Sequence, residues 1–111
     1  MDEKIYTFIG LAQKAGRLFS GEELCERALK KNKVKVLIVT EDASDNTKKK
    51  FSDMCSYRSV ELRYFGQKEI LGRYIGKEIR AVVGISDIGF TKKLLELLES
   101  RGLQNGGAKI G

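Results

Sequence analysis

Histidine is absent from the 111-residue sequence, and Cys25 and Cys55 are its only cysteines. The two cysteines form no Cys-x-x-Cys motif, so the sequence offers neither the usual ligand set for zinc nor a disulfide framework. The lack of histidine also excludes Ser-His-Asp and Cys-His catalysis, together with the most common general base near neutral pH. We therefore expect two buried thiols, no metal site, no cofactor and a protein that is not an enzyme.

Proline and long apolar runs are also absent. No stretch approaches the roughly 20 apolar residues that a membrane-spanning helix needs. The start Met1-Asp2-Glu3-Lys4 is acidic, whereas a signal peptide begins with basic residues and continues as an apolar core. Hydrophobic residues make up 41% of the chain and charged residues 32%, which is typical of a soluble globular protein. We expect one cytoplasmic domain, monomeric and without membrane contact.

Basic residues exceed acidic ones. Lys and Arg total 21 against 15 Asp and Glu, which gives a net charge of +6. Such an excess suits a domain that binds a polyanion, and an isoelectric point near 9.4 is typical of nucleic-acid-binding domains. A merely soluble basic surface explains the same numbers equally well. Charge alone leaves both interpretations open.

Apolar residues recur at helical spacing in five segments and form β-branched or alternating runs in three others. Ser20 precedes Glu23 by three residues, which is the capping-box pattern at the start of a helix. We predict helices at about 5–16, 21–32, 47–57, 70–75 and 90–98, strands at 34–39, 60–65 and 81–85, and a short extended link at 17–19. This alternation predicts an α/β domain with helices on both faces of a small mixed sheet, over residues 1–103. Residues 104–111 contain three glycines and lack periodicity, so we predict a flexible C-terminal tail.

The stretch from Gly72 to Lys77 superficially resembles a phosphate-binding loop. It is one residue too short between the glycines, and Glu78 stands where Ser or Thr would hold magnesium. We reject this interpretation. The two glycines Gly72 and Gly76 are better explained as positions of backbone freedom at the ends of a short helix.

Two further polar clusters allow more than one interpretation. Glu41 and Asp42 end a predicted buried strand, where α/β proteins often place carboxylates for metal or phosphate chemistry. No partner set completes such a site, and we favour a capping role for Asp42. The run Lys48-Lys49-Lys50 either clamps phosphates or forms a solvated helix face, and these alternatives stay open.

Several motifs, in this order and spacing, resemble the kink-turn RNA-binding ribosomal proteins of the L-seven-Ae type. The resemblance runs from about residue 4 to 100, and it is closest to the bacterial, YlxQ-like, ribosome-associated branch of that family. The motifs that carry it are Gly10–Arg17, Ser20-Gly21-Glu22-Glu23, Arg27-Ala28, Lys35–Ala43, Glu41–Lys50, Leu71–Gly76 and Ala81-Val82-Val83.

The resemblance implies a three-layer α-β-α sandwich with a small mixed four-stranded sheet. It also implies an RNA surface formed by residues 20–27 and 76–80. In that surface Gly21 lets RNA approach the helix start, Arg27 contacts guanine and Ile79 packs against a splayed base. The resulting RNA-binding residues are Ser20, Gly21, Glu22, Glu23, Arg27, Lys30, Lys48, Lys77, Ile79 and Arg80, with Lys31 and Lys33 adding general affinity for phosphate.

The leading hypothesis is a non-catalytic, ribosome-associated protein that binds structured, kink-turn-like RNA. The sequence departs from the family where Glu23 replaces Asn or Lys and Leu24 replaces Glu or Gln. These departures motivate an alternative, a protein-interaction module within a translation or transcription assembly. A third hypothesis is a phosphate-handling enzyme centred on Asp42.

Overall fold

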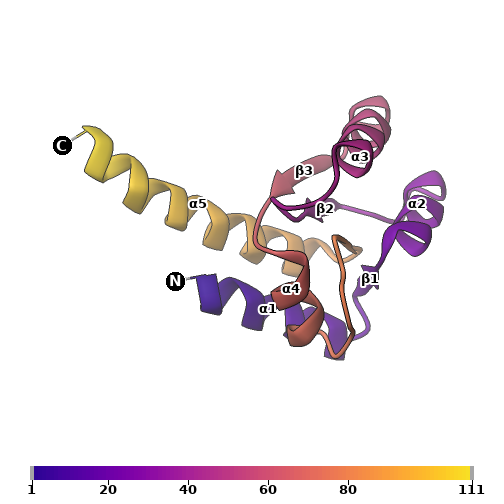
Figure 1. Cartoon of the computed structure of the whole chain (residues 1–111), viewed down its shortest axis with the longest axis horizontal. Helices are drawn as coiled ribbons and strands as arrows, with labels where there is room; N and C mark the ends of the chain where they lie inside the picture. Colours follow the sequence, from indigo (N-terminus) through magenta and orange to yellow (C-terminus); the bar gives the residue numbers. More distant parts are fainter. Residues whose placement is uncertain (1, 111) are drawn as a thin grey trace.

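The computed structural model describes the backbone of residues 2–110 and the side chains of residues 2–101. Helices and strands alternate along almost the whole chain (Figure 1). In chain order the elements are α1 (Asp2–Lys14), β1 (Leu18–Ser20), α2 (Glu22–Lys30), β2 (Val36–Val39), α3 (Asp45–Arg58), β3 (Glu61–Tyr64), α4 (Lys68–Tyr74), β4 (Val82–Ile85) and α5 (Ile88–Ile110).

The four strands form one mixed sheet in the order β1-β4-β2-β3. Strand β4 runs antiparallel to both of its neighbours, and β2 runs parallel to β3, with Val36 opposite Glu61. The predicted extended link at 17–19 is therefore the edge strand β1. The mixed four-stranded sheet that the resemblance implied is confirmed.

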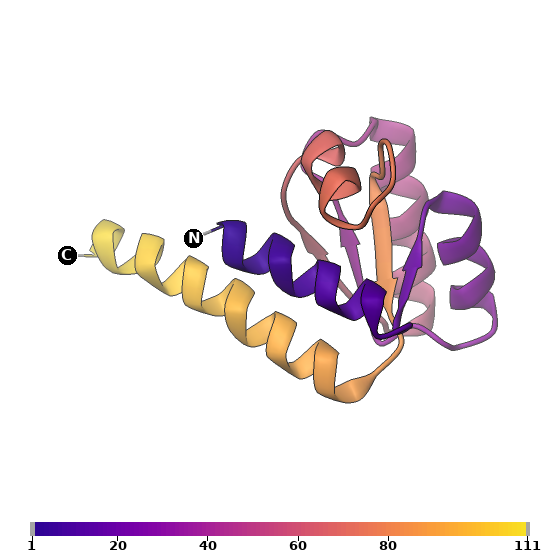
Figure 2. The same cartoon turned by 90° about the horizontal axis from the view of Figure 1, so that it is seen from below.

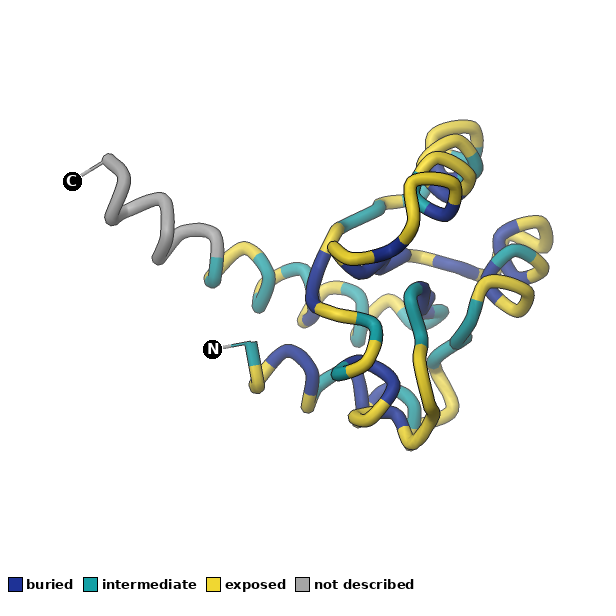
Figure 3. Tube along the Cα trace, viewed as in Figure 1, coloured by how far each residue is buried: buried dark blue, intermediate teal, exposed yellow. Residues whose placement is uncertain are grey.

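Helices cover both faces of the sheet, because the inner strands alternate apolar side chains between the two sides. Strands β2 and β4 are buried along their whole length (Figure 3). Val36 and Ile38 pack with buried residues of α1, α4 and α5, whereas Leu37 and Val39 pack with α2 and α3. Cys25 and Cys55 lie in this second layer as buried free thiols, as the sequence predicted.

The strand directions separate the links between elements into two groups at opposite ends of the sheet (Figure 2). One group comprises β1–α2, β2–α3, β3–α4 and α4–β4, and we call this the α4–β4 end. The other group comprises α1–β1, α2–β2, α3–β3 and β4–α5, and we call this the α2–β2 end. Helix α2 therefore begins at one end of the sheet and finishes at the other.

The predicted capping box at the start of α2 is wrong. Ser20 belongs to β1, where it lies opposite Val83, and Gly21 occupies the capping position without any side-chain hydrogen bond. The ladder of the sheet holds Ser20 in extended backbone, so the chain turns into α2 only at the next residue. Gly21 makes that turn with φ of 95° and ψ of 158°, a conformation essentially restricted to glycine.

Gly72 also differs from its predicted role, because it lies inside α4 and not at an end of it. A side chain at Gly72 would overlap the backbone carbonyl of Glu78. The glycine therefore permits the α4–β4 link to pack directly on the helix. Gly76 does end the short helix as predicted, with φ of 72°.

Helix α3 begins at Asp45, two residues before the predicted start, with Ser44 as its cap. Helix α5 continues to Ile110 and so includes most of the segment predicted as a separate tail. The side chains of residues 104–111 lie outside the described part, and the division at residue 103 stays a prediction. Among the described residues, no helix is long and apolar enough to cross a membrane.

Candidate nucleic-acid interface

A hollow of about 550 Å³ opens at the α4–β4 end of the sheet. It lies between the starts of α2 and α3 on one side and Lys68 with the α4–β4 link on the other. Four separate segments of the chain therefore meet around one concave surface. Its lining consists of Ser20, Gly21, Glu22, Glu23, Leu24, Ala43, Ser44, Thr47, Lys68, Ile79, Arg80 and Ala81.

The start of α2 is open toward this hollow. The Gly21 N–H donates to the Val82 carbonyl at 2.8 Å, which fixes the turn against β4. No side chain caps the helix, so the N–H groups of its first turn keep their capacity to donate to a ligand. A helix start of this kind also carries partial positive charge. The local backbone therefore suits an anion or a hydrogen-bond acceptor.

Arg80 lies across this helix start. A side-chain carbon built at Gly21 would lie 3.7 Å from the Arg80 Nε, which is an ordinary contact distance, so the two residues are direct neighbours. The Arg80 N–H donates to the Lys68 carbonyl at 3.1 Å, and its Nη1 donates to the Ile79 carbonyl at 2.9 Å. Within the described part, its Nε is buried and has no hydrogen-bond partner. The hollow thus holds a positioned guanidinium with donor capacity left unused.

Two apolar side chains line the same hollow while remaining half exposed. Leu24, on the first turn of α2, is 47% exposed, and Ile79, on the α4–β4 link, is 53% exposed. Burying either side chain against a partner is favourable, because apolar surface leaves water. The hollow therefore combines backbone donors and both signs of side-chain charge with apolar contact area.

A short chain of hydroxyl and carboxylate groups connects the starts of α2 and α3. The Ser44 hydroxyl donates to the Thr47 hydroxyl at 3.0 Å, and the Thr47 hydroxyl donates to Glu22 Oε2 at 2.9 Å. Ser44 also accepts from the Thr47 N–H at 3.1 Å as the cap of α3. Glu22 is therefore engaged in holding the two helix starts together.

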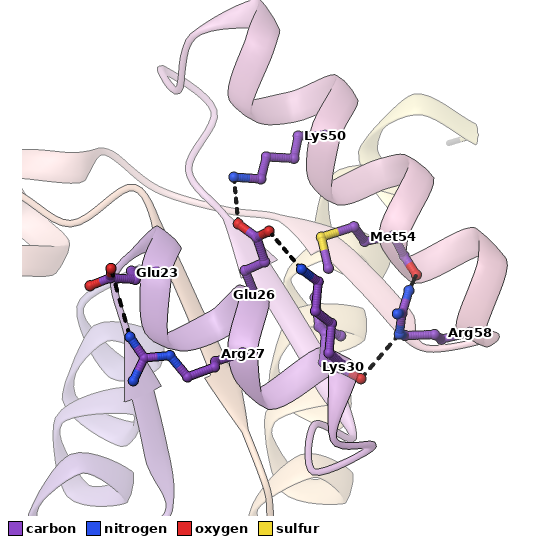
Figure 4. A network of polar contacts seen from close by, with 8 residues as sticks. Glu23, Glu26, Arg27, Lys30, Lys50, Met54 and Arg58 are labelled. Carbon is purple, nitrogen blue, oxygen red and sulfur yellow. Dashed lines mark hydrogen bonds and ion pairs between the residues drawn. The ribbon is translucent and has the colours of Figure 1, made fainter.

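Further along, one ion pair and one hydrogen bond connect α2 to α3 outside the hollow (Figure 4). Glu26 lies 2.6 Å from Lys50 on α3 and 3.2 Å from Lys30 on its own helix. The hydrogen bond from Lys50 is the main cause of a lowered pKa of the Glu26 carboxyl, and the same bond raises the pKa of Lys50. At the far end of α2, Arg58 Nε donates to the Leu29 carbonyl at 3.1 Å. The two helices are thus fastened along their length.

The predicted RNA-binding residues divide into two sets. Six of them line the hollow: Ser20, Gly21, Glu22, Glu23, Ile79 and Arg80. The other four lie outside its lining: Arg27, Lys30, Lys48 and Lys77. Of these, Arg27 lies on the exposed surface of α2, 3.7 Å from Glu23, and Lys48 stands 5.9 Å from the centre of the Tyr64 ring. The roles of all ten residues stay predictions.

Six lining residues were not among the ten predicted RNA-binding residues, although Leu24 lies within the predicted surface of residues 20–27. They are Leu24, Ala43, Ser44, Thr47, Lys68 and Ala81. Ser44 and Thr47 follow the buried strand β2, and the rule that sites open where strands end would have found them. No sequence pattern around Lys68 predicts that it lies in the hollow. It reaches the hollow only because its carbonyl accepts from the Arg80 N–H, a contact between segments far apart in sequence.

Asp42 lies next to this region, and its local contact is structural. Its Oδ1 accepts from the N–H of Lys68 at 3.0 Å. The carboxylate therefore caps the start of α4 and not the loop that follows Asp42 itself. Within the described part of the chain, no group of three or more Asp, Glu and Cys side chains is placed to hold a metal ion. This geometry gives no support to an enzyme centred on Asp42.

Comparison with known proteins identifies relatives along most of the chain. The family model described as the ribosomal protein L7Ae/L30e/S12e/Gadd45 family matches residues 3–95. The RNA-binding protein YlxQ of Bacillus subtilis (strain 168) is 42% identical over 94 residues, which cover 85% of this chain and 94% of the relative. The RNA-binding protein YlxQ of Enterococcus faecium is 46% identical over 98 residues, covering 87% and 93%.

Solved structures agree with this assignment. A protein of unknown function from Bacillus halodurans C superimposes with a TM-score of 0.82 at 38% identity, covering 86% of this chain and 97% of that chain. The Giardia lamblia 15.5kD RNA binding protein superimposes with a TM-score of 0.71 at 16% identity, covering 86% and 82%, and shows the fold alone. The predicted family and fold are confirmed. The chain belongs to the ribosomal protein L7Ae/L30e/S12e/Gadd45 family.

Proposed function

We propose that this protein binds structured RNA of the kink-turn type in the hollow at the α4–β4 end, without catalysing a reaction. The observation that carries the proposal is the meeting of an uncapped helix start, a positioned arginine and two half-exposed apolar side chains around one concave surface. The two YlxQ relatives are named as RNA-binding proteins. The partner we propose is ribosomal RNA. The protein would bind it in the cytoplasm as a monomer.

Each part of the hollow suits a different part of such an RNA. The N–H groups at the start of α2 and the Arg80 guanidinium donate to phosphate or base oxygens. Specific RNA recognition relies on unstacked bases that are splayed out of the helix. Leu24 and Ile79 offer apolar contact to such a base, and the exposed hydroxyl of Ser44 lies in the same lining. A sharply kinked RNA presents a splayed base and a close phosphate together.

Glu23 changes how the guanine contact works. Its side chain is 87% exposed and pairs with Arg27, whose side chain is 60% exposed. A carboxylate only accepts hydrogen bonds, so Glu23 favours base amino groups and disfavours phosphates. Because both side chains are exposed, their pairing is weak and opens at little cost. Arg27 is then free to reach a guanine beside the hollow.

The proposal is tested by measuring affinity for a kink-turn RNA and for a straight hairpin of the same length at several salt concentrations. Arg80→Gln should weaken binding to the kink-turn RNA about 10- to 100-fold, because it removes the guanidinium group that lies in the hollow. Arg73→Gln is the matched control, since Arg73 is exposed on α4 and does not line the hollow. Equal losses for the two variants, or no binding at low salt, would overturn the proposal.

A second candidate is a protein-interaction module that uses the same surface. It is favoured by the exposed Leu24 and Ile79 together with the acidic Glu22 and Glu23 at the rim of the hollow. Capture of partners from cell extract, with and without nuclease, separates the two functions. Partners that survive nuclease and are lost with Leu24→Ser favour the protein-interaction module, whereas partners released by nuclease favour RNA binding.

A further inference from the structure

A second basic surface lies at the α2–β2 end, opposite the hollow. It consists of four exposed residues, Arg17, Lys31, Lys33 and Lys35, which we call the basic rim. Arg17 precedes β1, and the three lysines belong to the link between α2 and β2. Two backbone bonds bring these links to the same strand end: the Ser86 N–H donates to the Arg17 carbonyl, and the Lys35 N–H donates to the Ile85 carbonyl.

The basic rim is not neutralised by ion pairs. Among the ion pairs of the described residues, none includes a member of the rim. Two carboxylates, on the β4–α5 link and at the start of β3, lie at the same end of the sheet and make other contacts. Asp87 Oδ2 accepts from the Phe90 N–H at 2.8 Å, and Glu61 pairs with Arg63. The rim therefore presents positive charge to solvent.

The three lysines stand on a rigid turn. The Asn32 N–H donates to the Leu29 carbonyl at 3.0 Å, and the Lys33 N–H donates to the Ala28 carbonyl at 2.9 Å. With Asn32 in the left-handed conformation at φ 57°, these bonds form a Schellman motif at the end of α2. Val34, buried between Lys33 and Lys35, anchors the next residues in the core. Little backbone conformational freedom is therefore left to lose when such a surface binds a ligand.

Stabilisation of helix ends explains why some of the basic residues lie at this end of the sheet, but not all of them. Cations stabilise a helix in its last turn, and Lys14, Lys30 and Arg58 already occupy the last turns of α1, α2 and α3. Lys33 and Lys35 lie beyond the end of α2, and Arg17 lies beyond the end of α1. A ligand with repeated negative charge explains the excess.

We propose that the basic rim is a second RNA-contact surface, which holds the backbone phosphates of a duplex arm that extends from the hollow. This inference rests on the proposed function of the hollow. Helix α2 connects the two surfaces, and its nine residues span about 13 Å. Arg27 and Lys30 lie along that path, each paired with a glutamate of the same helix. A duplex arm of about half a turn covers the distance.

The experiment compares Lys33→Gln/Lys35→Gln with Lys92→Gln/Lys93→Gln, a pair of exposed lysines on α5. Both double variants change the net charge equally. Against a kink-turn RNA with a long arm, the rim variant should reduce the magnitude of the negative slope of log affinity against log salt, by about 0.7 to 0.9 for each phosphate that its lysines no longer neutralise. The α5 variant should leave the slope unchanged. Equal changes in the two variants would show a general charge effect and overturn the inference.

Shortening the duplex arm provides the second readout. With an arm too short to reach the rim, the rim variant should bind as tightly as the unaltered protein, whereas a persisting difference would contradict the proposed path. The preference for kink-turn over straight RNA should be the same in the rim variant and the unaltered protein. If the unaltered protein showed no such preference, the proposed function of the hollow would be wrong. The comparison of salt dependence between the two lysine double variants on duplex RNA would still test whether the basic rim binds RNA.

Discussion

The backbone groups at the two ends of helix α2 are capped in opposite ways. At its start, Gly21 turns the chain without a side-chain cap, and the first backbone N–H groups open toward a hollow with Arg80 and apolar side chains. At its other end, the Schellman motif around Asn32 closes the backbone, and only lysine side chains remain to meet a ligand. Open backbone donors in a shaped hollow can distinguish one RNA shape from another. A closed turn with lysines offers charge alone, which adds affinity without specificity.

The largest effect is expected where the α4–β4 end depends on close backbone packing. Gly72→Ala places a methyl group into the Glu78 carbonyl and should lower the free energy of unfolding by about 3 kcal/mol, at the top of the range for overpacking. Gly76→Ala is the control, because no atom lies within 4 Å of its added carbon and only the strain of φ 72° remains, about 1 kcal/mol. Urea denaturation measures both. Equal losses would mean that the close approach of the two backbones is not what shapes this end.

The next largest effect is expected from substitutions that compare the start of α2 with its end. Gly21→Ala forces alanine into a conformation essentially limited to glycine and should cost about 1 to 3 kcal/mol of stability. It should also reduce affinity for kink-turn RNA, because relief of this strain shifts the backbone N–H groups that open toward the hollow.

Asn32→Ala provides the comparison at the other end of the same helix. It also strains a left-handed residue, at about 1 to 2 kcal/mol, but it should leave the preference for kink-turn RNA unchanged. Thermal unfolding and RNA titration of both variants give the two readouts. A loss of preference in Asn32→Ala as large as in Gly21→Ala would remove the distinction between the ends.

The sequence predicted the parts of this arrangement that depend on local pattern. Alternating helices and strands predicted the mixed sheet, and the family motifs predicted that Gly21 and Arg80 belong to one surface. The capping box failed because Ser20 pairs with Val83 of a strand more than sixty residues away. Lys68 was missed for the same kind of reason, because it reaches the hollow through its contact with the distant Arg80 and no local pattern encodes that contact. Thr47 could have been found from its place after β2, although its hydrogen bond to Glu22 could not.

The smallest effect concerns the ion pair that fastens α2 to α3 between the two ends. The pKa of Glu26 is lowered from its ordinary value near 4.5, chiefly by the hydrogen bond from Lys50. A carboxyl group whose pKa falls on folding stabilises the fold above its unfolded pKa, and this contribution is lost as the pH falls through the folded pKa. Glu26→Gln should therefore be less stable than the unaltered protein at pH 6, and the difference should shrink toward pH 3.

Denaturant midpoints at the two pH values test this expectation, with Glu96→Gln as the control, because none of the described ion pairs includes Glu96. Lys50→Gln should reproduce the larger part of the pH dependence of Glu26→Gln, since it removes the main partner of Glu26 and leaves Lys30 in place. If the loss of stability in Glu26→Gln stayed constant between pH 6 and pH 3, the effect would come from side-chain packing and not from the charge of Glu26. If Glu26→Gln also left the preference for kink-turn RNA unchanged, the shape of the hollow would not depend on the pair halfway along α2, and the contacts at the helix starts, such as the Glu22–Thr47 hydrogen bond, would be sufficient.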